Sequence, residues 1–116
     1  MTEETVYRTM LFDFYGELLT DKQKEYFDLH YNEDYSLSEI AEMTGISRQG
    51  VWDIIKRAEE TLRKTEEKTG LIRRFHENRA AVREIESSLE TLVSMTQGEA
   101  KALAEELAAK VQKLKE

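Results

Sequence analysis

Polar residues between positions 47 and 57 are of the types that read a DNA duplex. Arginine can form paired hydrogen bonds with guanine, and glutamine can form them with adenine, so Arg48 and Gln49 are the leading candidates for base contacts. Their neighbours on the exposed side of the same helix would face a major groove. The predicted DNA-contacting set is Ser47, Arg48, Gln49, Gly50, Trp52, Asp53, Lys56 and Arg57.

A second interpretation of these residues stays open. Arg48 and Gln49 could equally be solvated side chains in the first turn of a helix. Trp52 carries a single indole donor, and the carboxylate of Asp53 repels phosphate, although it can accept a hydrogen bond from cytosine. Trp52 and Asp53 therefore weaken the prediction of sequence-specific DNA reading.

A helix-turn-helix would position this surface. Ser36 with Glu39 forms a capping-box pattern, which predicts a short helix that ends at Thr44 and Gly45, and Ser47 occupies an N-cap position for the next helix. That second helix keeps one apolar face through Val51, Ile54, Ile55, Ala58 and Leu62. The motif requires a small residue where its helices touch, a glycine at the turn and branched apolar residues in its second helix. Ala41, Gly45, Val51 and Ile54 meet these requirements.

Two further helices precede the motif. Apolar residues at three- and four-residue spacing predict a first helix over residues 4–19, and a capping box at Thr20 and Gln23 predicts that a second begins near Asp21. The second helix should bury Tyr26 and Phe27, with Leu29 or His30. We expect the aromatic side chains around it to form a core rather than a base-stacking surface. They are Phe12, Phe14, Tyr15, Tyr26, Phe27, Tyr31 and Tyr35.

Long helices should follow the motif. Gly70 is expected to kink or end the preceding helix, a long helix should run to about Met95, and Thr96 with Glu99 predicts a capping box that opens a last helix. The long helix carries a nearly seven-residue apolar pattern, whose members are Phe75, Val82, Ile85, Leu89 and Leu92. This stripe could fold back on the N-terminal domain, pack on the last helix or pair with another copy, and we expect a symmetric homodimer. The sequence thus predicts an all-α protein with a helix-turn-helix domain at residues 1–69 and a helical extension at 70–116.

Residues 19–62, LTDKQKEYFDLHYNEDYSLSEIAEMTGISRQGVWDIIKRAEETL, resemble region 4 of the sigma factors that recognise the promoter −35 element. The segments LFDFYGELLTDKQ and SLSEIAEMTGISRQGVWDIIKRAEETL are similar to the YlxM-like family of small bacterial proteins, and this likeness covers roughly residues 4–75. The resemblance implies a DNA-binding-like regulatory protein that takes part in the signal recognition particle pathway. It implies no catalytic activity.

The charge distribution favours a rival hypothesis. Residues 1–69 hold 9 basic and 16 acidic side chains, whereas residues 70–116 hold 8 of each. Because phosphate affinity comes mainly from lysine and arginine, an acidic helix-turn-helix domain is unusual for a DNA-binding protein. The stretch 56–83 carries nine basic against five acidic residues, and it either solvates an exposed helix face or binds the particle's RNA or its GTPase. The alternative is therefore an accessory module that does not bind DNA.

Other chemistries find little support in the sequence. The chain has no cysteine, and His30 and His76 have no neighbouring ligand pattern, so we expect neither a metal site nor a cofactor. Asp13 and Glu17 could share a helix face, but such pairs usually face solvent rather than act as a general acid and base. We therefore expect no enzyme. Without an apolar leader or a long apolar segment, a cytoplasmic location is the expectation.

Overall fold

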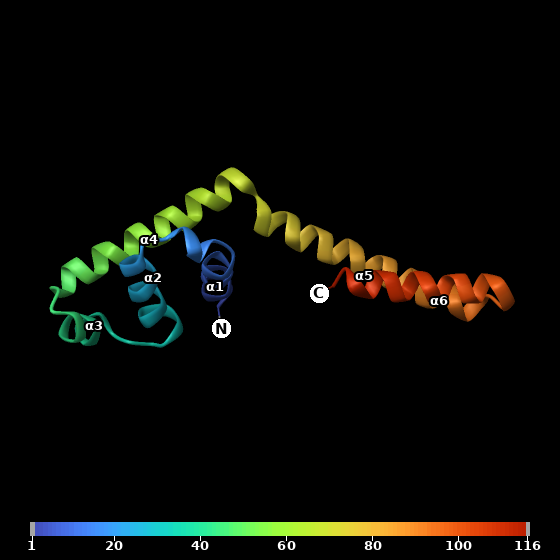
Figure 1. Ribbon diagram of the computed structural model, residues 1–116, viewed down its shortest axis with the longest axis horizontal. Coiled ribbons are helices and arrows are strands. Elements are labelled where there is room, and N and C mark those ends of the chain that lie inside the picture. The colour runs from blue at the N-terminus through green and yellow to red at the C-terminus, as the bar shows by residue number, and fades with distance from the viewer. Residues whose placement is uncertain (1, 116) are drawn as a thin grey trace. The chain divides into compact units, whose positions relative to one another are not determined.

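The computed structural model describes residues 2–115, and every regular element in that range is helical. The four helices of the first part are α1 (Glu3–Tyr15), α2 (Asp21–Phe27), α3 (Leu37–Thr44) and α4 (Arg48–Thr69). Two long helices follow, α5 (Leu71–Met95) and α6 (Gly98–Lys113) (Figure 1). The structure divides into two compact units, the first ending at Ile72 and the second beginning at Arg73. The prediction of an all-α fold is confirmed.

Local capping interactions begin three of these helices, as the sequence predicts. The Thr20 hydroxyl accepts from the amide of Gln23 at 3.2 Å while the Gln23 side chain accepts from the amide of Thr20 at 3.0 Å. Ser36 and Glu39 form the same reciprocal pair at the start of α3, and Ser47 caps α4. The hydrogen bond from the Ser36 amide also holds the pKa of Glu39 below its ordinary value. These caps satisfy amides that have no partner within their helix.

The first helix is shorter than predicted. It ends at Tyr15 instead of continuing to residue 19, and a turn of 3-10 helix spans Gly16–Leu18. The tighter turn brings Leu19 into the core, where it is 8% exposed, but leaves Leu18 on the surface at 64%. Phe14 is also exposed, so its predicted place in the aromatic core is wrong.

The core of the first unit forms around α4, which contacts α1, α2 and α3. Its fully buried side chains include Phe27 from α2, Ile40 from α3 and Ile55 from α4. The ring of Phe27 stacks on that of Phe12 with centroids 5.2 Å apart. The remaining aromatic residues of the predicted set, Tyr15, Tyr26, Tyr31 and Tyr35, are buried or pack against this core, while Leu29 and His30 are half-buried. A single turn of π-helix, Asp28–Asn32, joins α2 to the loop before α3.

A polar cluster lies at the C-terminal end of α4. The Tyr15 hydroxyl donates to Glu66 Oε1 at 2.6 Å, and the same oxygen accepts from the amide of Ile72 at 3.0 Å. Because Tyr15 has one hydroxyl proton, its 2.6 Å contact with Thr69 must be donated by the threonine. Burial, together with the Glu66 carboxylate, raises the pKa of Tyr15. Gly70 ends α4 in the left-handed conformation at φ 63°, and α5 begins at the next residue.

The second unit is an α5–α6 hairpin. Lys115 Nζ lies 3.3 Å from a carboxylate oxygen of Glu86, which places the end of α6 beside the middle of α5. Helix α5 ends at Met95 as predicted, but the predicted capping box is wrong: the Thr96 hydroxyl donates back to the Leu92 carbonyl, and no side chain caps α6. Across residues 2–115, none of the helices is long and apolar enough to cross a membrane.

Candidate nucleic-acid interface

Helices α3 and α4 form the predicted helix-turn-helix. Gly45 ends α3 with φ 77°, and its amide donates to the Ala41 carbonyl at 2.9 Å. A glycine suits this turn because a side chain is strained at positive φ. Val51 and Ile55 of α4 are fully buried, as is Ile40 of α3. The start of α4 is therefore held by its inner face.

Two of the eight predicted contact residues have structural roles. The Ser47 hydroxyl accepts from the amide of Gly50 at 3.0 Å, and this bond begins α4. A Cβ at Gly50 would lie only 2.8 Å from Cγ2 of Ile46, so the glycine permits close packing between the turn and the helix. The sequence identified the cap but gave no sign of the role of Gly50.

The other polar residues of the set lie on the surface of α4. Arg48, Gln49, Asp53, Lys56 and Arg57 are all exposed. With 3.6 residues per turn, Gln49, Asp53 and Lys56 share the side opposite the buried row. Gln49 Nε2 donates to Asp53 Oδ1 at 3.0 Å, so this amide already has an intrahelical partner. Among the described residues, Lys56 and Arg57 form no ion pair.

Trp52 is partly a core residue. It is half-buried and packs against the core, with its ring centroid 6.3 Å from that of His30. His30 is itself fixed, because its Nδ1 donates to the Tyr35 carbonyl at 2.8 Å. The exposed edge of the indole lines a shallow hollow together with Leu37, Arg48 and Gln49. That edge can form apolar contacts, whereas the rest of the ring supports the fold.

Beside this surface lies an ion-pair cluster that the sequence did not predict. Arg8 Nε donates to Glu59 Oε1 at 2.7 Å, and Arg63 Nε donates to Glu59 Oε2 at 3.0 Å, which ties α1 to α4. Arg63 also pairs with Glu4, and the guanidinium of Arg8 lies 4.3 Å from the ring centroid of Tyr31. Glu59 and Arg63 have the i, i+4 spacing of a helical ion pair, but Arg8 lies 51 residues before Glu59 and no local spacing predicts that contact.

The cluster sets the charge state of Glu59. Burial alone would raise the pKa of this carboxyl, but the hydrogen bonds and positive charges of Arg8 and Arg63 outweigh it and hold the pKa below its ordinary value. Arg63 belongs to the basic stretch 56–83, and its pairing with two glutamates reduces the charge available to an external partner. Within residues 2–115 no group of three histidines, cysteines or carboxylates could hold a metal ion.

Comparison with known proteins matches the sequence of this chain to a family. Residues 2–105 match the family described as "Putative helix-turn-helix protein, YlxM / p13 like" (UPF0122). A UPF0122 protein of Thermoanaerobacter sp. (strain X514) is 48% identical over 92 residues, 79% of each chain. A UPF0122 protein of Listeria welshimeri is 48% identical over 89 residues, 77% of this chain and 81% of the relative. The chain therefore belongs to this family of helix-turn-helix proteins.

Proposed function

We propose that the protein is a DNA-binding regulator that places the first half of α4 in the major groove. The observation that carries the proposal is the exposed start of α4, which is held by its buried face within a helix-turn-helix. In this motif the second helix contacts base edges with residues near its N-terminus. Arg48 and Gln49 occupy that position, and Lys56 and Arg57 supply positive charge without an ion pair to any residue of the described range 2–115.

Each residue has a distinct role in this proposal. Arg48 contacts a guanine edge or a phosphate, and Gln49 turns from Asp53 to an adenine edge when DNA binds. Lys56 and Arg57 bind phosphates. Asp53 then either accepts from a cytosine amine or disfavours sequences that lack one. Before DNA binds, the Gln49 side chain is held by its hydrogen bond to Asp53, and this bond has to break for Gln49 to reach a base.

The pathway part of the proposal comes from the resemblance. A regulatory role in the signal recognition particle pathway is what the YlxM-like resemblance implies, and a non-catalytic role accords with a helix-turn-helix family. The cytoplasmic location that we propose for this role comes from the sequence expectation instead. The alternative function is an accessory module that binds the particle's GTPase or RNA. The net charge of −7 and the occupied Gln49 amide favour this alternative, because both weaken contact with a duplex.

Alanine variants separate the two functions. We expect Arg48→Ala combined with Gln49→Ala to reduce binding to a duplex, measured by fluorescence anisotropy, while leaving binding to the particle RNA or its GTPase unchanged. Lys68→Ala is the matched control for duplex binding, because Lys68 is an exposed cation of the same helix about 30 Å further along the axis than Arg48. Wild-type binding only to RNA or to the GTPase complex would replace the DNA function by the alternative.

We also propose that the protein acts as a homodimer. Helix-turn-helix proteins commonly read two half-sites through a symmetric dimer, with recognition helices one DNA turn apart. The second unit is the natural place for the contact, since α3 and α4 have to stay free for DNA.

A further inference from the structure

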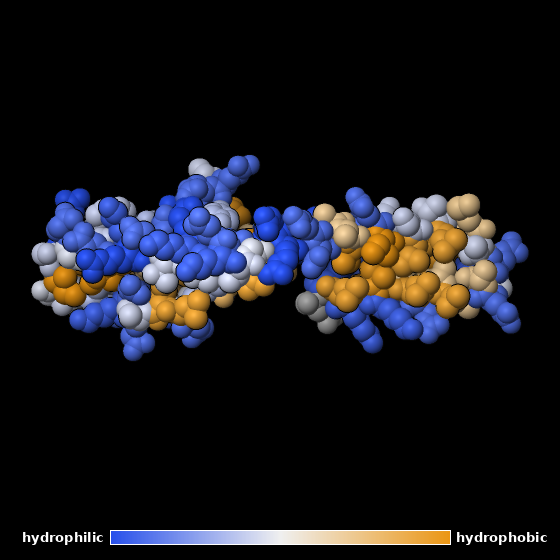
Figure 2. All heavy atoms as spheres, turned by 90° about the horizontal axis from the view of Figure 1, so that it is seen from above, coloured by the Kyte–Doolittle hydropathy of each residue, from blue (hydrophilic) through white to orange (hydrophobic). Residues whose placement is uncertain are grey.

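The hairpin of α5 and α6 buries very little of its own apolar surface. Among its described residues only Ala104 is fully buried, at 1% exposure, while Val82 and Leu89 are half-buried. Large apolar side chains stay exposed on both helices, and Figure 2 shows a broad apolar patch over α5 and α6. Helices in water normally bury such a stripe against another element.

The exposed apolar residues occupy one face. On α5, the half-buried residues Val82 and Leu89 form the row that faces α6, and Ile85 and Leu92 lie to one rotational side of that row. On α6, Leu103 and Leu107 lie to the same rotational side of the buried Ala104. Because α5 and α6 are antiparallel, residues displaced by the same rotation from the contact on each helix lie on the same face of the hairpin. We call Ile85, Leu92, Leu103, Leu107 and Leu114 the hairpin face, and their exposures run from 40% to 68%.

The size of the hairpin face suits a protein partner. Helix α6 has 16 residues and is therefore about 24 Å long, and two adjacent helices are about 20 Å wide. The face covers roughly 500 Å² in projection, which is the product of this length and this width, and its accessible area is larger because side chains protrude from it. Stable interfaces bury about 800 Å² on each partner, so the face is of the right order.

The charges beside the hairpin face match a second copy of the chain. The outer flank of α6 is acidic before Leu107, at Glu99 and Glu106, and basic after it, at Lys110 and Lys113. A half-turn about an axis near Leu107 sets each acidic half opposite the basic half of the other copy. Residues 73–116 as a whole hold eight basic and eight acidic side chains, so two hairpins carry no net repulsion.

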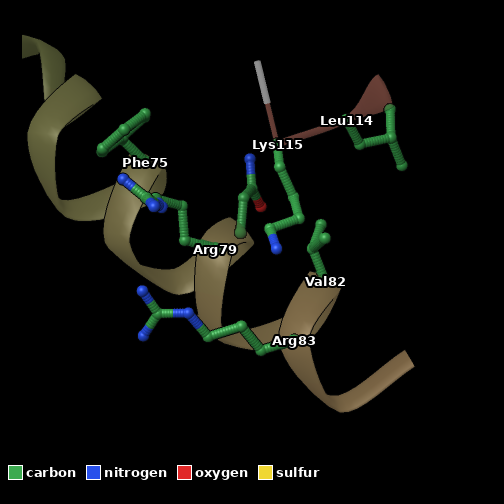
Figure 3. A pocket seen from close by; sticks show the side chains of 7 residues that line it. Phe75, Arg79, Val82, Arg83, Leu114 and Lys115 are labelled. Carbon is green, nitrogen blue, oxygen red and sulfur yellow. The ribbon is translucent and has the colours of Figure 1, made fainter. Parts of the chain in front are cut away.

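A hollow lies at the end of the hairpin away from the α5–α6 turn, and it is consistent with the same half-turn. Phe75 and Val82 of α5 line it together with Leu114, and its volume is about 210 Å³ (Figure 3). At the opposite end of the hairpin Met95 is 74% exposed. The half-turn exchanges the two ends, which brings Met95 of each copy to the hollow of the other. Methionine is flexible and apolar, and so suits an irregular apolar hollow.

We propose that two copies join through the hairpin face, with α6 antiparallel to α6 and α5 antiparallel to α5, as a four-helix bundle. This inference rests on the proposed homodimer and adds its surface and symmetry. The bundle buries the hairpin face on both chains.

Sedimentation equilibrium of the full chain tests the proposal. We expect twice the 13.6 kDa chain mass for the wild type at micromolar concentration and the monomer mass for Leu107→Glu and Ile85→Glu. Val6→Glu is the matched control and should remain dimeric, because Val6 lies in the first unit and is 44% exposed, close to the 47% of Ile85. Circular dichroism at 222 nm should show equal helix content in all four chains.

A cysteine variant gives a second readout, and it changes the hairpin face less than a glutamate does. The chain has no cysteine, so Leu107→Cys introduces a single thiol near the proposed axis, and mild oxidation should give a disulfide-linked dimer. A wild-type monomer would refute the homodimer and the hairpin face together. A dimer that persists in both glutamate variants, or Leu107→Cys that does not cross-link, would refute the hairpin face alone.

Discussion

Replacement of Glu66 by alanine should destabilise the first unit strongly. The carboxylate accepts from Tyr15 and from the amide of Ile72, and hydrogen bonds to a charged group contribute about 1.5–3 kcal/mol each. The Tyr15 bond belongs at the lower end, because Tyr15 keeps its contact with Thr69. The amide of Ile72 would lose its partner in a residue that is 2% exposed. We therefore expect Glu66→Ala to lower the free energy of unfolding by about 3 kcal/mol.

Urea unfolding followed by tryptophan fluorescence measures this effect. Trp52 is the single tryptophan and lies in the first unit, so its signal reports that unit directly. Tyr15→Phe should cost about 1.5 kcal/mol, since it removes one of the two bonds to Glu66 together with the contact to Thr69. Glu67→Ala, a change at the exposed neighbouring position, should stay within about 0.5 kcal/mol of wild type. If Glu66→Ala behaved like Glu67→Ala, the polar cluster would not stabilise the unit.

Two further predictions concern the turn and the ion-pair cluster. Gly45→Ala should lower the free energy of unfolding by about 1 kcal/mol through backbone strain alone, because φ is 77° and nothing lies within 4 Å of the added Cβ; an unchanged urea midpoint would contradict this. For Glu59 the folded-state pKa is lowered, so its stabilisation is present above the unfolded pKa of about 4.3 and is lost as the pH falls through the folded value. The gap in unfolding free energy between wild type and Glu59→Gln should thus be constant above about pH 5 and shrink below about pH 4; an equal gap at pH 7 and pH 3 would count against the cluster.

Local signals made much of the first unit predictable. Ser36 with Glu39 and Thr20 with Gln23 specify helix starts by short-range hydrogen bonds, and both pairs form as expected. The same pattern failed at Thr96, because its hydroxyl bonds back to the preceding turn instead of capping the next helix. A capping pattern shows that a bond can form, and the local backbone decides which one does.

Long-range contacts were not predictable from spacing. Glu59 meets Arg8 across 51 residues, and Tyr15 meets Glu66 across the same separation. Both depend on how α1 packs against α4, which periodicity does not specify. At the candidate interface the sequence singled out Arg48 and Gln49, but the Gln49–Asp53 bond and the packing role of Gly50 came only from the structure.

The dependence of duplex binding on salt tests the central proposal most directly. Each phosphate contact contributes about 0.9 to the slope of log Kobs against log salt, so contacts from Arg48, Lys56 and Arg57 predict a slope of about −3. Combined alanine substitution of these three residues should bring the slope close to zero. A wild-type chain that fails to bind duplex DNA at about 50 mM salt, or a triple variant with an unchanged slope, would contradict a DNA-reading role for α4.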